Sequence, residues 1–360
     1  MLKKEIDIFS NMARPEIRNF EEYDPGEVPE NCLKIHANEN NMGVSPKALD
    51  AMTRALKKGN RYPESRSSSL CKKIASVYGL RPEQILTGNG LDGIFTMLGR
   101  AFLNSDDDVI CGELTFSVYA DTARIMGANP VFVPMTNKMA LDITGHINAI
   151  TEKTKMIFFC NPNNPTGTAA SLDDIEKIIQ AAPKTALFIL DEAYIEFSGG
   201  LVESGFPLLK KYPNLVVCRT FSKIYGLAGL RLGWVAANPE LLKYVFKVRE
   251  PYCVTEVAAA GAEAALDDDA FVNKSLKTEI EERANLSAFF DDKGIKYIPS
   301  FANFILFFVD DPERVHAFLT KDGILIRILS FQGKKALRVT IGLPEENKLL
   351  MGSLTKALNL

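Results

Sequence analysis

Between residues 85 and 235, short runs of aliphatic and β-branched residues alternate with stretches of helical spacing. Apolar runs without polar interruption are typical of strands buried on both faces. Their alternation with helices predicts a mainly parallel sheet covered by helices on both sides. The predicted strands are 84–87, 108–111, 130–133, 155–160, 186–190 and 215–218.

The pattern changes on either side of this region. A helix is predicted from Pro46, with Ser45 as its N-cap, and a long helical region covers about 237–292. After it, strand-like runs alternate with two further helices, which predicts a small α+β domain. Prolines disfavour helix near the N-terminus, so we expect an arm there. The predicted parts are an N-terminal arm (1–40), a large α/β domain (41–250) and a small C-terminal domain (251–360).

Composition favours a folded enzyme that acts on a small molecule. The 360 residues are 46% hydrophobic and 24% charged, as in ordinary globular proteins, with a formal net charge of −3. This charge offers no broad positive field for nucleic acid or anionic lipid. The N-terminus lacks the apolar core of a signal peptide, and no apolar run approaches the ~20 residues that span a bilayer. We therefore expect a cytoplasmic protein without nucleic-acid or membrane partners.

Cysteine and histidine usage disfavours metal chemistry. The six cysteines form no CxxC pair, and the three histidines lie far apart. Neither a zinc site nor a disulfide framework is indicated, and a serine-histidine triad would have few candidate residues.

The segment Arg219-Thr-Phe-Ser-Lys223-Ile-Tyr-Gly-Leu-Ala-Gly-Leu-Arg231 carries the most specific chemistry. A lysine condenses with a carbonyl only as the neutral amine, which is scarce at its usual pKa of about 10.4. Thr220, Ser222 and Arg231 supply two hydroxyls and a guanidinium, which together can hold a phosphate. If the ring attached to that phosphate carries an aldehyde, Lys223 can react with it.

Three further segments follow predicted strands. Asp191-Glu-Ala-Tyr194 places a carboxylate at the end of a strand, where α/β sheets bind ligands and where it can keep a pyridine nitrogen protonated. Asn161-Pro-Asn-Asn164-Pro-Thr-Gly167 is a turn. Thr87-Gly-Asn-Gly-Leu-Asp-Gly93 is a glycine-rich turn before a helix, where free N–H groups favour an anion.

Together these segments resemble fold type I aminotransferases that depend on pyridoxal 5'-phosphate, in particular the histidinol-phosphate aminotransferase family. The motifs occur in the family's order from Tyr23 to the segment Gly342-Leu-Pro-Glu-Glu-Asn347. The resemblance implies an aspartate aminotransferase-like fold with a mainly parallel seven-stranded sheet. It also implies pyridoxal phosphate as cofactor and a homodimer with a shared active site.

The resemblance assigns roles to individual residues. Lys223 binds the cofactor covalently, and Asp191 pairs with the ring nitrogen. The phosphate is held by Thr220, Ser222, Arg231, the backbone of Leu91 and Asp92, and Tyr62 from the partner subunit. Tyr194 and Asn164 bond the ring oxygen, and Phe116 stacks on the ring. The substrate contacts are Tyr23, Arg327 and Arg338.

The substrate is less closely defined than the cofactor. In histidinol-phosphate aminotransferases the two arginines resemble groups that hold the substrate phosphate, with 2-oxoglutarate as acceptor. In amino-acid aminotransferases Arg338 would hold an α-carboxylate, and both groups are anions that a guanidinium binds. An aromatic or other amino-acid aminotransferase, a threonine-phosphate decarboxylase and an inactive binding module are the alternatives. The sequence departs from the family's pattern at Asn41, Leu91, Gly93, Cys253 and Thr255.

Overall fold

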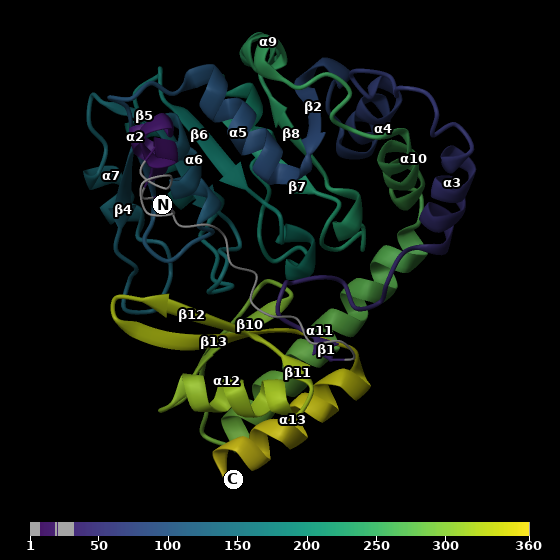
Figure 1. The fold of residues 1–360 in the computed structure, drawn as a ribbon, viewed down its shortest axis with the longest axis vertical. Helices are drawn as coiled ribbons and strands as arrows, with labels where there is room; N and C mark the ends of the chain where they lie inside the picture. The colour runs from purple at the N-terminus through teal and green to yellow at the C-terminus, as the bar shows by residue number, and fades with distance from the viewer. Residues whose placement is uncertain (1–7, 19, 21–31, 360) are drawn as a thin grey trace.

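A seven-stranded sheet forms the centre of the larger part of the molecule. The computed structural model describes residues 8–18, 20 and 32–359, and Figure 1 shows the sheet with helices on both faces. The strands are β2 (Ile85–Asn89), β3 (Asp108–Gly112), β4 (Asn129–Val133), β5 (Thr154–Cys160), β6 (Leu187–Asp191), β7 (Leu215–Thr220) and β8 (Leu232–Ala237). Their order is β2-β8-β7-β6-β5-β3-β4.

The predicted mainly parallel sheet is confirmed. Strands β4, β3, β5, β6 and β7 pair in parallel, and β8 runs antiparallel between β7 and β2. All six predicted strands are present with small changes at their ends. Strand β8 was not predicted, because its first residues continue the glycine-rich segment that follows Lys223. The turn between β7 and β8 therefore presents this lysine at one edge of the sheet.

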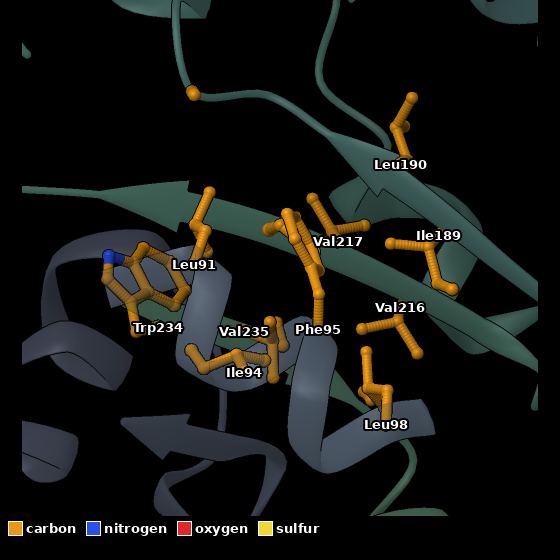
Figure 2. Packing of buried hydrophobic residues seen from close by; sticks show 14 of the residues in the cluster. Leu91, Ile94, Phe95, Leu98, Ile189, Leu190, Val216, Val217, Trp234 and Val235 are labelled. Carbon is orange, nitrogen blue, oxygen red and sulfur yellow. The ribbon is translucent and has the colours of Figure 1, made fainter. Parts of the chain in front are cut away.

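Apolar helix faces cover the sheet. In Figure 2 side chains of helix α5 (Gly90–Phe102) such as Phe95 and Leu98 lie over Val216 and Val217 of β7, and all four are buried. Burying side chains of this size stabilises the fold by about 1.5–3 kcal/mol each. The other helices of this part are α3 (Pro46–Leu56), α4 (Ser68–Tyr78), α6 (Val118–Met126), α7 (Ile143–Asn148), α8 (Leu172–Ala181), α9 (Pro239–Val248) and α10 (Glu256–Ala265).

Helix α3 begins as the sequence predicts. Ser45 is its N-cap and accepts a hydrogen bond from the N–H of Ala48, while Pro46 occupies the first helical position. Short 3-10 helices complete the larger part: η1 (Pro82–Gln84), η2 (Ile195–Ser198), η3 (Phe206–Lys210) and η4 (Ala228–Leu230). Near the N-terminus, α2 (Pro15–Arg18) lies against α6, where Arg14 donates a hydrogen bond to the carbonyl of Ile125 at 2.8 Å.

A four-stranded antiparallel sheet forms the smaller part. Its order is β12-β13-β10-β9, and helix α11 links it to the larger part (Figure 1). The elements are α11 (Asp269–Asp292), β9 (Lys296–Ile298), β10 (Phe304–Phe308), α12 (Pro312–Lys321), β11 (Ile324–Leu325), β12 (Arg327–Phe331), β13 (Lys334–Thr340) and α13 (Pro344–Leu358). The predicted small α+β arrangement is confirmed.

Two segments pack on a different part of the molecule from the one in which the sequence placed them. Strand β1 (Leu33–Lys34) pairs in parallel with β11, and Ile35 joins the core of the smaller part. Helix α10 packs on α3, and its residues Ala258 and Ala262 belong to the core of the larger part. The boundaries at 40 and 250 stay predictions.

No helix in the described ranges combines the length and apolarity needed to cross a membrane. Within the same ranges, no three or more His, Cys, Asp or Glu side chains are grouped so that they could hold a metal ion.

Candidate active site

A cavity of about 490 Å³ lies where the parallel strands β5, β6 and β7 end. The smaller part contributes residues of β12 and β13 to its wall. The cavity brings together most of the residues that the sequence singled out: Leu91, Asp92, Phe116, Asn164, Asp191, Tyr194, Thr220, Ser222, Lys223, Arg231, Arg327 and Arg338. Tyr62 is not among the lining residues, and Tyr23 lies outside the described residues.

Lys223 faces this cavity from the turn between β7 and β8. Its Nζ donates a hydrogen bond to the carbonyl of Ala37 at 3.1 Å and lies 5.4 Å from the centre of the Tyr194 ring. Burial, and then the nearby charge of Arg338, lower the pKa of the amine to about 8. About a tenth of the amine is then neutral at pH 7, far more than for an exposed lysine. The structure therefore supplies the nucleophilic form that condensation with a carbonyl needs.

Asp191 ends strand β6 and is 3% exposed. Its Oδ2 accepts a hydrogen bond from the Tyr119 hydroxyl at 2.7 Å, and its Oδ1 accepts one from the N–H of Ala193 at 3.0 Å. Burial raises the pKa of this carboxyl to about 6, against the opposing effect of both hydrogen bonds. The carboxylate is thus mainly ionised at neutral pH, in a place where it can keep a bound ring nitrogen protonated.

The side chain of Arg338, in β13 of the smaller part, bonds Asn164 of the larger part across the cavity. Arg338 is 8% exposed, and its Nη1 and Nη2 donate to Asn164 Oδ1 at 2.6 Å and to the carbonyl of His36 at 2.7 Å. Arg327 lies directly opposite Arg338 in the antiparallel pair β12–β13. Opposite residues share a face of a sheet, so both guanidiniums lie on the cavity side. This end of the cavity suits an anionic substrate group.

Tyr194 lies beside this group and is buried. Its hydroxyl accepts a hydrogen bond from Asn38 Nδ2 at 3.1 Å, and its ring meets Phe304 edge-on. Burial raises the pKa of the phenol above its ordinary value, so the hydroxyl keeps its proton and can donate it to a ligand oxygen.

The opposite end of the cavity is built for an anion close to the backbone. Gly90 has φ +71°, and a Cβ on it would lie 2.8 Å from Arg231 Nη2. A Cβ on Gly233 would lie 2.9 Å from the backbone of Gly90. Only glycine therefore fits where strand β8 and the start of α5 meet. The first-turn N–H groups of α5 have no partner within the helix, and together with Arg231 they favour an anion there.

The donors around the cavity fit pyridoxal phosphate. Thr220 and Ser222, which carry hydroxyls, line the same cavity as Arg231, and such donors suit a phosphate. Lys223 supplies an amine for an aldehyde, and Asp191 supplies a carboxylate for a ring nitrogen.

The sequence departures have different consequences. Leu91 lines the cavity, and its side chain packs into the core near Trp234 (Figure 2). Only its backbone can therefore offer a polar group to a ligand. Asn41 bonds Glu346 at 2.6 Å, and Thr255 caps helix α10. Neither they, nor Gly93 nor Cys253, are among the residues that line the cavity.

Sequence reasoning did not assign Tyr119 and Asn38, which support Asp191 and Tyr194. Tyr119 is fully buried in the first turn of α6 and stacks on Phe158 at 4.6 Å. A buried tyrosine needs a hydrogen-bond partner, which was the available signal. Its partner lies 72 residues further along the chain, and no local pattern identifies it.

Comparison with known proteins gives the same assignment. The family model "Aminotransferase class I and II" matches residues 30–354. The chain is 36% identical to histidinol-phosphate aminotransferase 2 of Hydrogenovibrio crunogenus, over 98% of this chain and 97% of that protein.

Solved structures agree with this result. Histidinol-phosphate aminotransferase from Sinorhizobium meliloti, in complex with pyridoxal 5'-phosphate, has a TM-score of 0.89 and 25% identity, covering 96% of this chain and 97% of its own. A Thermus thermophilus aspartate aminotransferase variant, at 20% identity, shares the fold with a TM-score of 0.79, covering 96% and 98%. The chain therefore belongs to the aminotransferase class I and II family and, within it, to the histidinol-phosphate aminotransferase family.

Proposed function

We propose that this protein transfers the amino group of histidinol phosphate to 2-oxoglutarate, a step of histidine biosynthesis. The products are imidazole-acetol phosphate and glutamate. The observation that carries the proposal is the single cavity that holds Lys223 and Asp191 at one side and two arginines at the other. The relative from Hydrogenovibrio crunogenus, matched over nearly its full length, supports the choice of substrate.

Pyridoxal phosphate supplies an aldehyde that accepts an amine and a ring that withdraws electrons from the reacting carbon. Thr220, Ser222, Arg231 and the N–H groups of Leu91 and Asp92 hold its phosphate. The glycine contacts at the start of α5, which admit no side chain, support this placement.

The ring is held by three side chains and stacked on a fourth. Asp191 keeps the ring nitrogen protonated, and Tyr119 and Ala193 fix the orientation of its carboxylate. Tyr194 and Asn164 bond the ring oxygen, and Phe116 stacks on the ring. Lys223 would supply the amine that an aldehyde at this place binds, and as a free amine it would take the proton from the carbon that bears the substrate amine.

Arg327 and Arg338 hold the substrate phosphate, and Tyr23 adds a hydroxyl to them. The buried position of Arg338 and its bonds to Asn164 and His36 support a fixed orientation of its guanidinium. A fixed guanidinium binds a phosphate oxygen pair with little loss of entropy.

The enzyme works as a homodimer in the cytoplasm, with Tyr62 of each subunit contacting the cofactor phosphate of the other. Tyr62 is 83% exposed and lies outside the cavity of its own chain, which supports a role toward a second subunit.

Covalent trapping tests the proposed cofactor bond. Borohydride reduction of the coloured holoprotein, followed by peptide mass spectrometry, should place the pyridoxyl mass on Lys223. The variant K223A should trap none. Attachment to another lysine would contradict the assignment.

Half-reactions identify the substrate. The visible absorbance of the bound cofactor should be lost at far lower concentrations of histidinol phosphate than of phenylalanine or other α-amino acids. Preference for an α-amino acid would identify an amino-acid aminotransferase. Release of carbon dioxide from threonine phosphate without an oxo acid would identify a decarboxylase.

A further inference from the structure

Tyr62 has one side-chain neighbour that the proposed two-subunit site leaves unexplained. Its ring stacks on Tyr252, with the ring centres 4.7 Å apart and the planes 23° apart. Both rings are exposed to solvent, at 83% for Tyr62 and 44% for Tyr252. Neither residue is among those lining the cavity of the same chain.

The backbone around Tyr62 is fixed independently of this stack. Glu64 accepts hydrogen bonds from the N–H groups of Arg66 at 3.0 Å and Ser68 at 2.6 Å. Arg249 bonds the carbonyls of Ser65 and, at 3.2 Å, of Thr87 in strand β2. The loop that carries Tyr62 is thus tied to the strand that leads into the glycine-rich turn at the phosphate end of the cavity.

The Tyr62 side chain itself has no such ties. No hydrogen bond of its hydroxyl is present among residues 8–18, 20 and 32–359. Without the stack, rotation about its side-chain bonds would carry the hydroxyl through a wide range of positions. Tyr252 is therefore the contact that limits where this hydroxyl lies.

Tyr252 combines this contact with an unfavourable backbone conformation. Its φ is +58°, in the left-handed region that L residues with a bulky side chain rarely occupy. Such strain persists where the surrounding structure holds it, and it is common at functional sites.

We propose that Tyr252 is a positioning residue that holds Tyr62 of its own subunit, so that the Tyr62 hydroxyl bonds the cofactor phosphate in the partner subunit. This inference rests on the two-subunit site proposed above. Ordering a side chain in advance removes part of the entropy that binding would otherwise cost. Loss of the Tyr252 ring should therefore weaken cofactor binding by about two- to tenfold.

Cofactor titration of the single variants gives the first test. Absorbance titration of apoprotein should show weaker binding for Y252A, a similar loss for Y62F, and nearly unchanged binding for Y252F, which keeps the ring. Y252N is the backbone-matched variant, because asparagine tolerates a positive φ while removing the ring. Wild-type affinity in Y252N would overturn the proposal, even if Y252A folded poorly.

Hybrid dimers then decide which subunit the ring serves. Two affinity tags allow isolation of dimers with one intact Lys223, and borohydride-trapped cofactor measures occupancy at limiting pyridoxal phosphate. When a K223A subunit is paired with a Y252N subunit, the intact Lys223 lies in the Y252N subunit. This site should bind pyridoxal phosphate with wild-type affinity, because the K223A partner that supplies Tyr62 has an intact stack. When a K223A/Y252N subunit is paired with a wild-type subunit, the intact Lys223 lies in the wild-type subunit, and its partner lacks the stack. This dimer should bind pyridoxal phosphate as weakly as the Y252N homodimer.

The reverse result would show that Tyr252 serves its own subunit and would overturn the inference. The same two hybrids made with Y62F in place of Y252N test the shared site itself. If the Y62F hybrids also fail to show the partner effect, the two-subunit site is wrong. If they show it and the Y252N hybrids do not, only the role of Tyr252 is wrong.

Discussion

At the residue scale, the site depends on two ionisable groups whose pKa values are brought closer together by their surroundings. The pKa of the Lys223 amine is lowered to about 8 and that of the Asp191 carboxyl is raised to about 6, in both cases mainly by burial. Between these values the carboxylate is mostly ionised, and above pH 7 an increasing fraction of the amine is neutral. The protein without cofactor is therefore best prepared for covalent capture above pH 7.

Arg338 should tune the reaction of Lys223 with the cofactor. Its positive charge helps to lower the pKa of the amine, so R338Q should raise that pKa. We expect the pH midpoint for covalent capture of pyridoxal phosphate to rise, and capture at pH 7 to slow several-fold. Stopped-flow absorbance without substrate measures this. R327Q removes another arginine of the cavity, which is not among the main influences on the pKa of Lys223, and should leave the midpoint unchanged.

Tyr119 should control the acid limit of catalysis. Its hydrogen bond lowers the pKa of Asp191, so Y119F should raise it and protonate the carboxyl at a higher pH. We expect kcat to fall several-fold at pH 6 and to stay near wild type at pH 8. The kcat of D191N, whose side chain has no charge at any pH, should be lower by about two orders of magnitude or more at both pH values. A pH-independent loss in Y119F would contradict this role.

Individual site residues differed in how far the sequence revealed them. Lys223, Asp191 and Arg231 stand in motifs long enough to be recognised, and the structure places all three at one cavity. Tyr119 was not assigned a role, because its partner Asp191 lies 72 residues away. Asn38 lies in a segment that resembles the family's, Asn38-Glu-Asn40, but its bond to Tyr194, 156 residues away, could not be predicted.

At the element scale, buried strands were predictable and the antiparallel strand was not. Strands β5 and β6 consist almost wholly of buried residues, which gives continuous apolar runs. Strand β8 begins with Leu232-Gly-Trp, and its place between β7 and β2 is set by pairings with residues that precede it in the chain. Local periodicity carries no information on such pairings.

Helix α11 carries a buried acid that should make stability depend on pH. Burial raises the pKa of Glu279 to about 8, although Arg283 lies 4.0 Å away. The folded protein then keeps a proton that the unfolded chain loses near pH 4.3, so stability falls as pH rises from about 4 to 8. E279Q should remove this loss.

Urea unfolding at two pH values tests this prediction. E279Q should be more stable than wild type at pH 8.5, on the order of 2 kcal/mol, and close to wild type at pH 5. Glu281 lies in the same helix with an exposed side chain, so E281Q is the control and should show little change at either pH. Equal stabilisation at both pH values would rule out titration of Glu279 as the cause.

At the scale of the whole molecule, the cavity wall is made by both sheets. Residues of β6 and β7 in the larger part and of β12 and β13 in the smaller part line it together. A ligand that fills this cavity therefore contacts both parts. Cofactor binding should stabilise the molecule as a unit.

Thermal unfolding measures this coupling. At a concentration of pyridoxal phosphate one hundred times its Kd, the folded state should gain about 2.7 kcal/mol, and both parts should unfold together at a higher Tm. K223A, which lacks the covalent bond, should show a smaller increase at the same concentration. Two separate transitions, of which only one moves with cofactor, would contradict a shared cavity.

The contact between the start of the chain and strand β13 bears on when the enzyme can mature in the cell. Ile35 accepts a hydrogen bond from the N–H of Thr340, Asn38 donates one to its hydroxyl, and His36 accepts one from Arg338. A ribosome makes His36 and Asn38 302 residues before it makes Arg338 and Thr340. The finished pocket therefore arises only after strand β13 has been made, and a chain that is cut short before Thr340 lacks a complete pocket.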